Sequence, residues 1–175
     1  MPTALVIIDA QIGILDGAYQ ADAILAALGE ALQRARQANA PVLFLRHNHS
    51  TFEPLKKGAS TWEIHPAVAP RAGEVIVDKT ASDGFWGTEL ERTLDDSGVE
   101  RIAVGGLQTE FCVDATCRSA LSKGFDVVLI ADGHTTGDAV TDAATTIRHH
   151  NYALTRLAHP THSVVAKRAD ELEFG

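Results

Sequence analysis

The chain has 175 residues, and its 15 Lys and Arg against 23 Asp and Glu give a formal net charge of −8. A nucleic-acid partner is disfavoured, because binding to phosphates needs a basic stripe and this sequence contains no extended run of Lys or Arg. An anionic membrane surface is disfavoured for the same reason. The hydrophobic fraction is 45%, which is ordinary for a globular protein, and the length predicts one domain, residues 1–175, with one core.

Only two cysteines occur, Cys112 and Cys117. They are too few for a disulfide framework, and they lack the paired Cys and His spacing of a zinc site, so a reducing compartment is favoured. The first apolar run, residues 4–8, is far shorter than the ~20 residues that cross a bilayer. We therefore expect a cytoplasmic protein.

Short runs rich in Val and Ile alternate along the chain with longer amphipathic stretches. This alternation is typical of βαβ units, whose crossovers are right-handed. We therefore expect an α/β fold with three layers, α/β/α: a mostly parallel, Rossmann-like sheet of about six strands with helices on both faces. The expected elements, in chain order, are a strand at 4–8, a helix at 21–38, strands at 42–45 and 75–77, a helix at 88–97, a strand at 102–104, a helix at 110–123, a strand at 127–130, a helix at 138–157 and a strand at 163–165.

Residues 47–73 are the exception to this alternation. The segment carries three prolines and two glycines and shows no sustained periodicity. Structureless segments of this length are uncommon in compact domains and usually serve a function. Ligands of open parallel sheets bind outside the carboxyl ends of the strands, so the residues at those ends are the candidates for a site.

Two charged side chains end predicted strands. Asp9 follows the first strand, where burial can raise its pKa and make it a competent base. A carboxylate that caps the following turn is an equally good interpretation. Lys79 ends the third strand and could hold a thiolate or a substrate anion, although a lysine at such a position is more often solvated.

Cys112 is the sharpest candidate for a nucleophile. It follows Gly105-Gly106, which permits a tight turn from strand to helix, and Thr109 is a natural N-cap that places Cys112 in the first helical turn. The helix dipole there predicts a thiol pKa lowered from ~8.5 toward neutrality. The alternative is a small buried residue, which is the favoured interpretation of Cys117.

Three segments together resemble the motifs of a known enzyme superfamily. The first-strand motif is ALVIIDAQ at residues 4–11, and the second is Lys79 followed by Ser82, Phe85, Thr88 and Leu90. The third and most specific is GLQTEFCV at residues 106–113, which runs on through Thr116, Arg118, Ala120 and Gly124 and then VVLIAD at 127–132. These motifs resemble those of the isochorismatase-like cysteine hydrolases, which include nicotinamidases and N-carbamoylsarcosine amidases.

The resemblance implies a catalytic triad of Asp9, Lys79 and Cys112. It also implies a non-proline cis peptide at Leu107-Gln108 and an oxyanion hole made by the backbone N–H groups of Gln108 and Cys112. The implied reaction is hydrolysis of a small amide or related C–N bond through a cysteine thioester, without a redox cofactor. The implied partners are a small-molecule substrate and further copies of the chain in a homo-oligomer.

Histidines after the second strand raise the question of a metal. Nicotinamidases hold a zinc-type metal through an Asp-x-His pair plus a further His, whereas here His47 replaces the Asp, with His49 and His65 downstream. These imidazoles could bind metal, but ordinary loop histidines are the favoured interpretation, and we expect no metal. The nicotinamidase interpretation is weakened accordingly. Isochorismatases, which cleave a vinyl ether, need no thiol, so retention of Cys112 favours amide hydrolysis.

Several residues near the motifs are candidates for the substrate pocket, although packing in a core or an interface is at least as good an interpretation of the aromatic ones. The pocket candidates are Gln11, Trp62, Phe85, Trp86 and Phe111. His134 could reach the site, but a satisfied loop histidine is favoured.

Two other classes of protein remain. A haloacid-dehalogenase-like phosphotransferase would also place an Asp after the first strand, but Gln11 stands where its second acid belongs. A non-catalytic member of the same fold would bind a small molecule with a vestigial triad, and the presence of all three residues counts against it.

Overall fold

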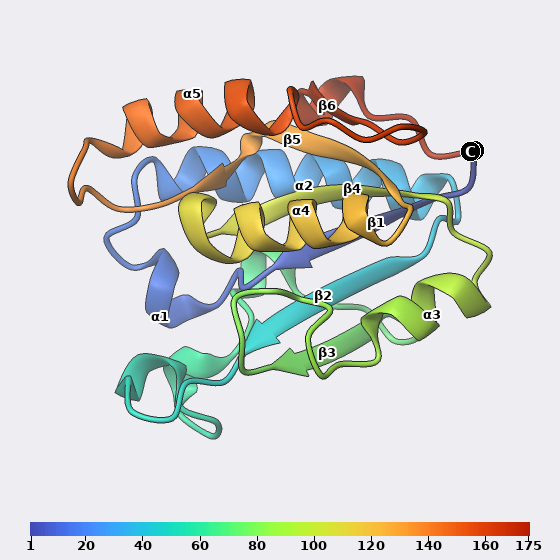
Figure 1. The fold of residues 1–175 in the computed structure, drawn as a ribbon. Helices are drawn as coiled ribbons and strands as arrows, with labels where there is room; N and C mark the ends of the chain where they lie inside the picture. The colour runs from blue at the N-terminus through green and yellow to red at the C-terminus, as the bar shows by residue number, and fades with distance from the viewer.

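A six-stranded, all-parallel sheet forms the centre of the molecule in the computed structural model, which describes residues 1–175 (Figure 1). The order of the strands across the sheet is β3-β2-β1-β4-β5-β6. Their bounds are β1 Thr3–Ile8, β2 Val42–His47, β3 Val75–Lys79, β4 Arg101–Leu107, β5 Asp126–Thr135 and β6 Val164–Lys167. The predicted α/β class and the parallel sheet are therefore confirmed.

Helices cover both faces of the sheet, and β1 is buried between them. Ala4, Val6 and Ile8 pack in one core with side chains from three of the helices, while Leu5 and Ile7 pack in a second core against the longest helix, α2. Parallel strands that are covered on both faces need such continuous apolar runs. The helices are α1 Ile12–Leu15, α2 Ala21–Gln37, α3 Leu90–Asp96, α4 Asp114–Ser122 and α5 Ala143–Leu154.

The structure differs from the sequence-based expectation in its short elements. The helices expected at 88–97 and 138–157 are shorter than predicted, and α1 has no predicted counterpart because four residues show no periodicity. The segment 47–73 is not structureless. It forms 3₁₀ turns at Glu53–Leu55, Ser60–Trp62 and Pro66–Val68, and Ile64 makes a single β-bridge to Gln11.

All the strands point the same way, so their carboxyl ends meet at one edge of the sheet (Figure 1). The segment 47–73 and α1 lie at this edge, beyond the arrowheads of β1, β2 and β3. None of the helices is both long and apolar enough to cross a membrane. The cytoplasmic location stays a prediction.

Gly106 allows β4 to approach β1 closely at this edge. Its φ is +128°, and a Cβ at this position would lie 1.9 Å from the backbone oxygen of Ile8. We expect Gly106→Ala to lower the free energy of unfolding by about 3 kcal/mol or more, since the strained φ and the clash with backbone add. Urea denaturation followed by circular dichroism measures this difference.

The matched control is Gly29→Ala in the middle of α2, where an added Cβ meets no atom within 4 Å. That variant should gain about 0.5 to 1 kcal/mol, because Ala is the better helix former. Equal stability of Gly106→Ala and the parent protein would contradict the close approach of the two strands.

Candidate active site

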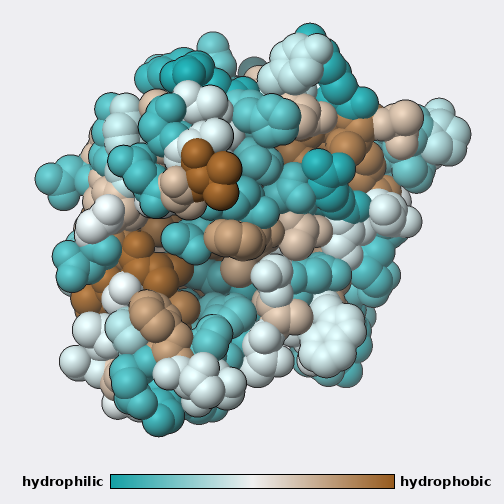
Figure 2. Space-filling view, turned by 60° about the vertical axis from the view of Figure 1, so that its left-hand side comes forward, coloured by the Kyte–Doolittle hydropathy of each residue, from teal (hydrophilic) through white to brown (hydrophobic).

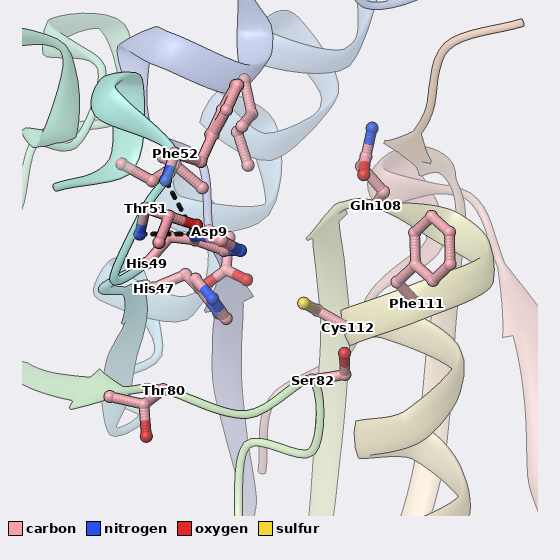
Figure 3. Close-up of a pocket in the computed structure, with 12 residues that line it drawn as sticks. Asp9, His47, His49, Thr51, Phe52, Thr80, Ser82, Gln108, Phe111 and Cys112 are labelled. Carbon is pink, nitrogen blue, oxygen red and sulfur yellow. Dashed lines mark hydrogen bonds between the residues drawn. The ribbon is translucent and has the colours of Figure 1, made fainter.

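A cavity of about 740 Å³ opens at the carboxyl edge of the sheet. The face of the molecule seen in Figure 2 is hollowed, with apolar patches beside a polar recess. Residues from the ends of β1 and β2, from the segment 47–73 and from the loops after β3 and β4 line the cavity (Figure 3). The lining consists of Asp9, Ile14, His47, His49, Thr51, Phe52, Leu55, Thr80, Ser82, Gln108, Phe111 and Cys112.

Asp9 lies at the base of the cavity, directly after β1. Its side chain is buried, and its φ of +47° is an unusual left-handed conformation that Asp tolerates better than most residues. Oδ2 is 2.7 Å from Lys79 Nζ, whereas Oδ1 has no hydrogen-bond partner. Burial raises the pKa of Asp9, although the Lys79 charge acts in the opposite direction. The carboxylate is thus a stronger base than an exposed one and has a free oxygen.

Lys79 is as deeply buried as Asp9, although it ends an edge strand. Its ammonium is surrounded by acceptors from four segments of the chain. Besides Asp9, these are His47 Nδ1 at 3.1 Å, the backbone oxygen of Ala81 at 3.0 Å and Cys112 Sγ at 3.2 Å. A buried ammonium needs such compensation for its lost hydration, so the alternative of a solvated lysine is wrong.

Cys112 lies in a wide turn, not in the first turn of an α-helix. Residues Thr109–Val113 form a π-helical turn that precedes α4, in which Val113 N donates to Gln108 O at 3.2 Å. The predicted N-cap role of Thr109 is wrong, because its hydroxyl is 2.9 Å from His134 Nδ1 instead. π-turns inside helical segments often occur at functional sites. Figure 3 shows the Cys112 sulfur pointing toward Asp9 and His47.

The predicted lowering of the thiol pKa is also wrong. Burial raises the pKa of Cys112 to about 12, and the negative charge of Asp9 adds to this, while Lys79 acts in the opposite direction. The prediction considered only the helix dipole, whose effect does not offset burial beside a carboxylate. In the resting site the sulfur therefore carries its proton.

The structure brings Asp9, Lys79 and Cys112 together at one point. The carboxylate of Asp9, the imidazole of His47 and the sulfur of Cys112 lie within 4.8 Å of one another, and the Lys79 ammonium contacts all three. The peptide bond Leu107-Gln108 is cis, as the resemblance implies, and Gln108 lines the cavity beside Cys112. Cys117, in contrast, is fully buried in the core, as predicted.

Of the three predicted metal candidates, His47 and His49 lie side by side on the cavity wall, with ring centroids 5.9 Å apart, whereas His65 lies elsewhere. His49 Nδ1 accepts hydrogen bonds from the backbone N–H groups of Thr51 and Phe52, and His65 Nδ1 accepts one from Ala67. His65 lines a different hollow of the surface. These residues are held as ordinary loop histidines.

Asp9, His47 and Cys112 are close enough to ligate an ion, but the Lys79 ammonium lies among them. A second cation there would meet strong repulsion, so the residues of this structure do not fit a zinc-type metal.

Of the five pocket candidates, Phe111 lines the cavity and the other four are not among its lining residues. Gln11 and Trp62 are buried behind it, and both bond to the backbone of His47. Phe85 stacks on Phe125 in the core, and Trp86 is 65% exposed. His134 is fully buried with both ring nitrogens bonded, so it is satisfied as favoured from the sequence, although it lies in β5 and not in a loop.

Several lining residues were not identified from the sequence as candidates for the site. They are Ile14, Thr51, Phe52, Leu55, Thr80 and Ser82, of which Ser82 was noted only as part of a motif. The aperiodicity of the segment 47–73 was the available signal, but it does not indicate which side chains turn inward.

Comparisons with known proteins agree with this geometry. The family model described as the isochorismatase domain matches residues 3–169. Streptothricin hydrolase of Streptomyces noursei is 38% identical over 138 residues, which are 77% of this chain and 55% of that protein. Ureidoacrylate amidohydrolase of Variovorax paradoxus is 31% identical over 91 residues, or 51% of this chain and 36% of that protein. The chain spans about half the length of the streptothricin hydrolases it matches.

A solved structure shows the same fold. N-carbamoylsarcosine amidase from Thermoplasma acidophilum has a TM-score of 0.82, with 99% of each chain covered and 23% sequence identity. At this identity the likeness concerns the fold alone.

The reactivity of the thiol tests the electrostatics of the site. We expect the alkylation rate of Cys112 by iodoacetamide to keep rising above pH 9, and at pH 8 to be about tenfold or more below that of free cysteine, because its pKa is raised. Peptide mass spectrometry assigns the alkylated residue. Asp9→Asn should lower this pKa, since it removes a negative charge. A plateau near neutral pH in the parent protein would contradict the arrangement.

The pH dependence of stability tests the burial of His134. Burial lowers its pKa from 6.5 to about 4, so the unfolded chain binds the proton that the folded protein excludes. Stability should therefore fall as the pH decreases from 6.5 to 4, by up to about 1.4 kcal/mol per pH unit for this group. His134→Gln should flatten this slope in urea denaturation across the same range, and an unchanged slope would refute the assignment.

Proposed function

The chain belongs to the isochorismatase family, and from this premise we propose that it is a cysteine hydrolase that cleaves a small amide or a related C–N bond. The observation that carries the proposal is the buried group of Asp9, Lys79 and Cys112 at the base of an open cavity. An amidohydrolase among the relatives of the chain supports this reaction class.

The first step is the attack of Cys112 on the substrate carbonyl. The free Oδ1 of Asp9 accepts the thiol proton while the sulfur forms a bond to the carbonyl carbon. The Lys79 ammonium, 3.2 Å from Sγ, stabilises the negative charge that develops on the sulfur. The raised pKa of Asp9 favours its acceptance of the proton, whereas the raised pKa of the thiol opposes its release.

The tetrahedral intermediate then breaks down. Its oxygen accepts hydrogen bonds from the backbone N–H groups of Gln108 and Cys112, which we assign as the oxyanion hole. The C–N bond breaks as Asp9 returns the proton to the leaving nitrogen, and the acyl group remains on Cys112 as a thioester. Water, deprotonated by Asp9, attacks the thioester, the C–S bond breaks, the sulfur regains its proton and the acid product leaves.

The cavity favours an uncharged acyl group. Its apolar walls come from Ile14, Phe52, Leu55 and Phe111, and its other lining groups outside the catalytic cluster are hydroxyls, an amide and the imidazole of His49. Its lining includes no arginine and no lysine, and the ammonium of Lys79 is already surrounded by acceptors. We therefore propose small, partly apolar amides as substrates, in preference to those that carry a carboxylate.

Substitution of the two reacting residues tests the mechanism. We expect Cys112→Ala and Asp9→Asn each to lower kcat at least 1000-fold, on the order seen when a nucleophile or its base is removed, with circular dichroism unchanged. The assay is a panel of small amides, ureas and nicotinamide, run with and without chelator. Turnover by Cys112→Ala at the parent rate would overturn the proposal.

The covalent intermediate supplies a second test. Rapid acid quench during turnover should trap an adduct on Cys112 whose mass equals that of the substrate minus the leaving amine. Cys117→Ala is the matched control and should form the same adduct, because Cys117 is buried in the core. An adduct on any residue other than Cys112 would contradict the assigned nucleophile.

A further inference from the structure

His47 contacts Lys79 and lies beside Asp9 and Cys112, yet the proposed mechanism gives it no role. It ends β2, and its register partner across the parallel pair is Lys79 at the end of β3. Its imidazole lines the cavity next to Asp9 and Cys112 (Figure 3). Its side chain is therefore in a position to act on the chemistry of the site.

The backbone of His47 is held by two side chains that are themselves buried. The Gln11 amide makes a closed pair of hydrogen bonds with it: His47 N donates to Oε1 at 2.8 Å, and Nε2 donates to His47 O at 3.0 Å. The Trp62 indole donates a further hydrogen bond to the same oxygen at 3.0 Å. Gln11 is fully buried and Trp62 nearly so. Three hydrogen bonds from side chains therefore fix the backbone of His47 at the end of β2.

The direction of the hydrogen bond between His47 and Lys79 is determined by chemistry. Lys79 Nζ lies 3.1 Å from Nδ1, and an ammonium can only donate. Nδ1 therefore accepts, and the imidazole proton resides on Nε2. Burial and the Lys79 charge lower the pKa of His47 to about 4, so the ring remains a neutral acceptor at pH 7.

The ammonium has three N–H groups, but four acceptors surround it. Asp9, His47 and Ala81 lie at or just beyond the ends of three neighbouring strands, and together they hold the nitrogen in place. The fourth acceptor, Cys112 Sγ, lies 3.2 Å away on the turn before α4. The position of the ammonium relative to the sulfur thus depends on the other three acceptors.

We propose that His47 is a positioning residue, which accepts a hydrogen bond from Lys79 at Nδ1 and thereby holds the ammonium beside the sulfur of Cys112. The role rests on the proposed function, in which the ammonium stabilises the thiolate. Without this acceptor, the ammonium moves toward Asp9 and water enters the space of the ring. Nothing in this role requires His47 to touch the substrate.

Three substitutions of His47 distinguish the positioning of Lys79 from contact with the substrate. In His47→Asn the amide oxygen reaches the place of Nδ1 and can accept from Lys79, whereas in His47→Gln the amide reaches the place of Nε2. His47→Leu fills a similar volume and has no acceptor. We expect Leu and Gln to lower kcat about tenfold or more with little change in KM, since a hydrogen bond to a charged group is lost. Asn should keep kcat within about threefold.

A second measurement does not depend on turnover. Because Lys79 lowers the thiol pKa, the alkylation rate of Cys112 at pH 9 should fall severalfold in the Leu and Gln variants and remain near the parent value in Asn. The melting temperature of each variant monitors its folding. If the parent hydrolyses no amide, the proposed function fails, but the alkylation series still tests His47.

Two results would overturn the inference. Parent-like alkylation and kcat in His47→Leu would show that Lys79 needs no help from this residue. Rescue by Gln but not by Asn would show that Nε2 contacts the substrate, which makes His47 a catalytic residue of a different kind.

Discussion

A buried ammonium is the constraint on which the candidate site depends. Removing a charged group from water costs several kcal/mol, and only well-placed partners offset it. The partners of Lys79 come from the end of β1, the end of β2, the segment after β3 and the turn before α4. These segments are far apart in the sequence. Each must lie where it does for the ammonium to remain buried, so the same contacts that solvate the charge also assemble the site.

The topology of the sheet explains why a lysine serves at this position. β3 is an edge strand, and β2 separates it from β1, which Asp9 directly follows. A side chain from β3 must therefore cross one strand to reach the carboxylate. Lysine has a long and flexible stem that places a compact charge at such a distance. The side chain passes beside its register partner His47, which is why the two contact each other.

The reactivity of the resting site depends on how Cys112, Asp9 and Lys79 affect one another's protonation. The thiol is protonated and the carboxylate has a raised pKa, both chiefly because they are buried, while the ammonium favours the negative charge on either. A bound substrate that excludes water and presents its carbonyl carbon to the sulfur changes the protonation of Cys112 in the mechanism we propose. Reactive cysteines of other proteins often rely on a helix N-terminus to form a thiolate. Here the neighbouring ion pair takes that place in the mechanism we propose.

Much of the architecture follows from local pattern. Runs of Val and Ile, together with helical periodicity, identify six strands and the longer helices, because burial on both faces of a parallel sheet requires continuous apolar segments. Asp9 and Lys79 could be identified because parallel strands bring their carboxyl ends to one edge. Cys112 could be identified because a thiol follows a glycine pair at such an end. The motifs that link them carry the resemblance to the family.

The features of the site that could not be predicted from the sequence depend on contacts between distant segments. The sequence suggested that Gln11 and Trp62 line the pocket, but both instead fix the backbone of His47, and His47 in turn contacts Lys79. The segment 47–73 supplies much of the cavity wall through turns that no periodicity marks. The thiol pKa rises because burial and Asp9 outweigh the turn that carries Cys112. Composition and spacing determine which residues meet at an edge, whereas burial and hydrogen-bond direction, which set their chemistry, exist only once the chain has folded.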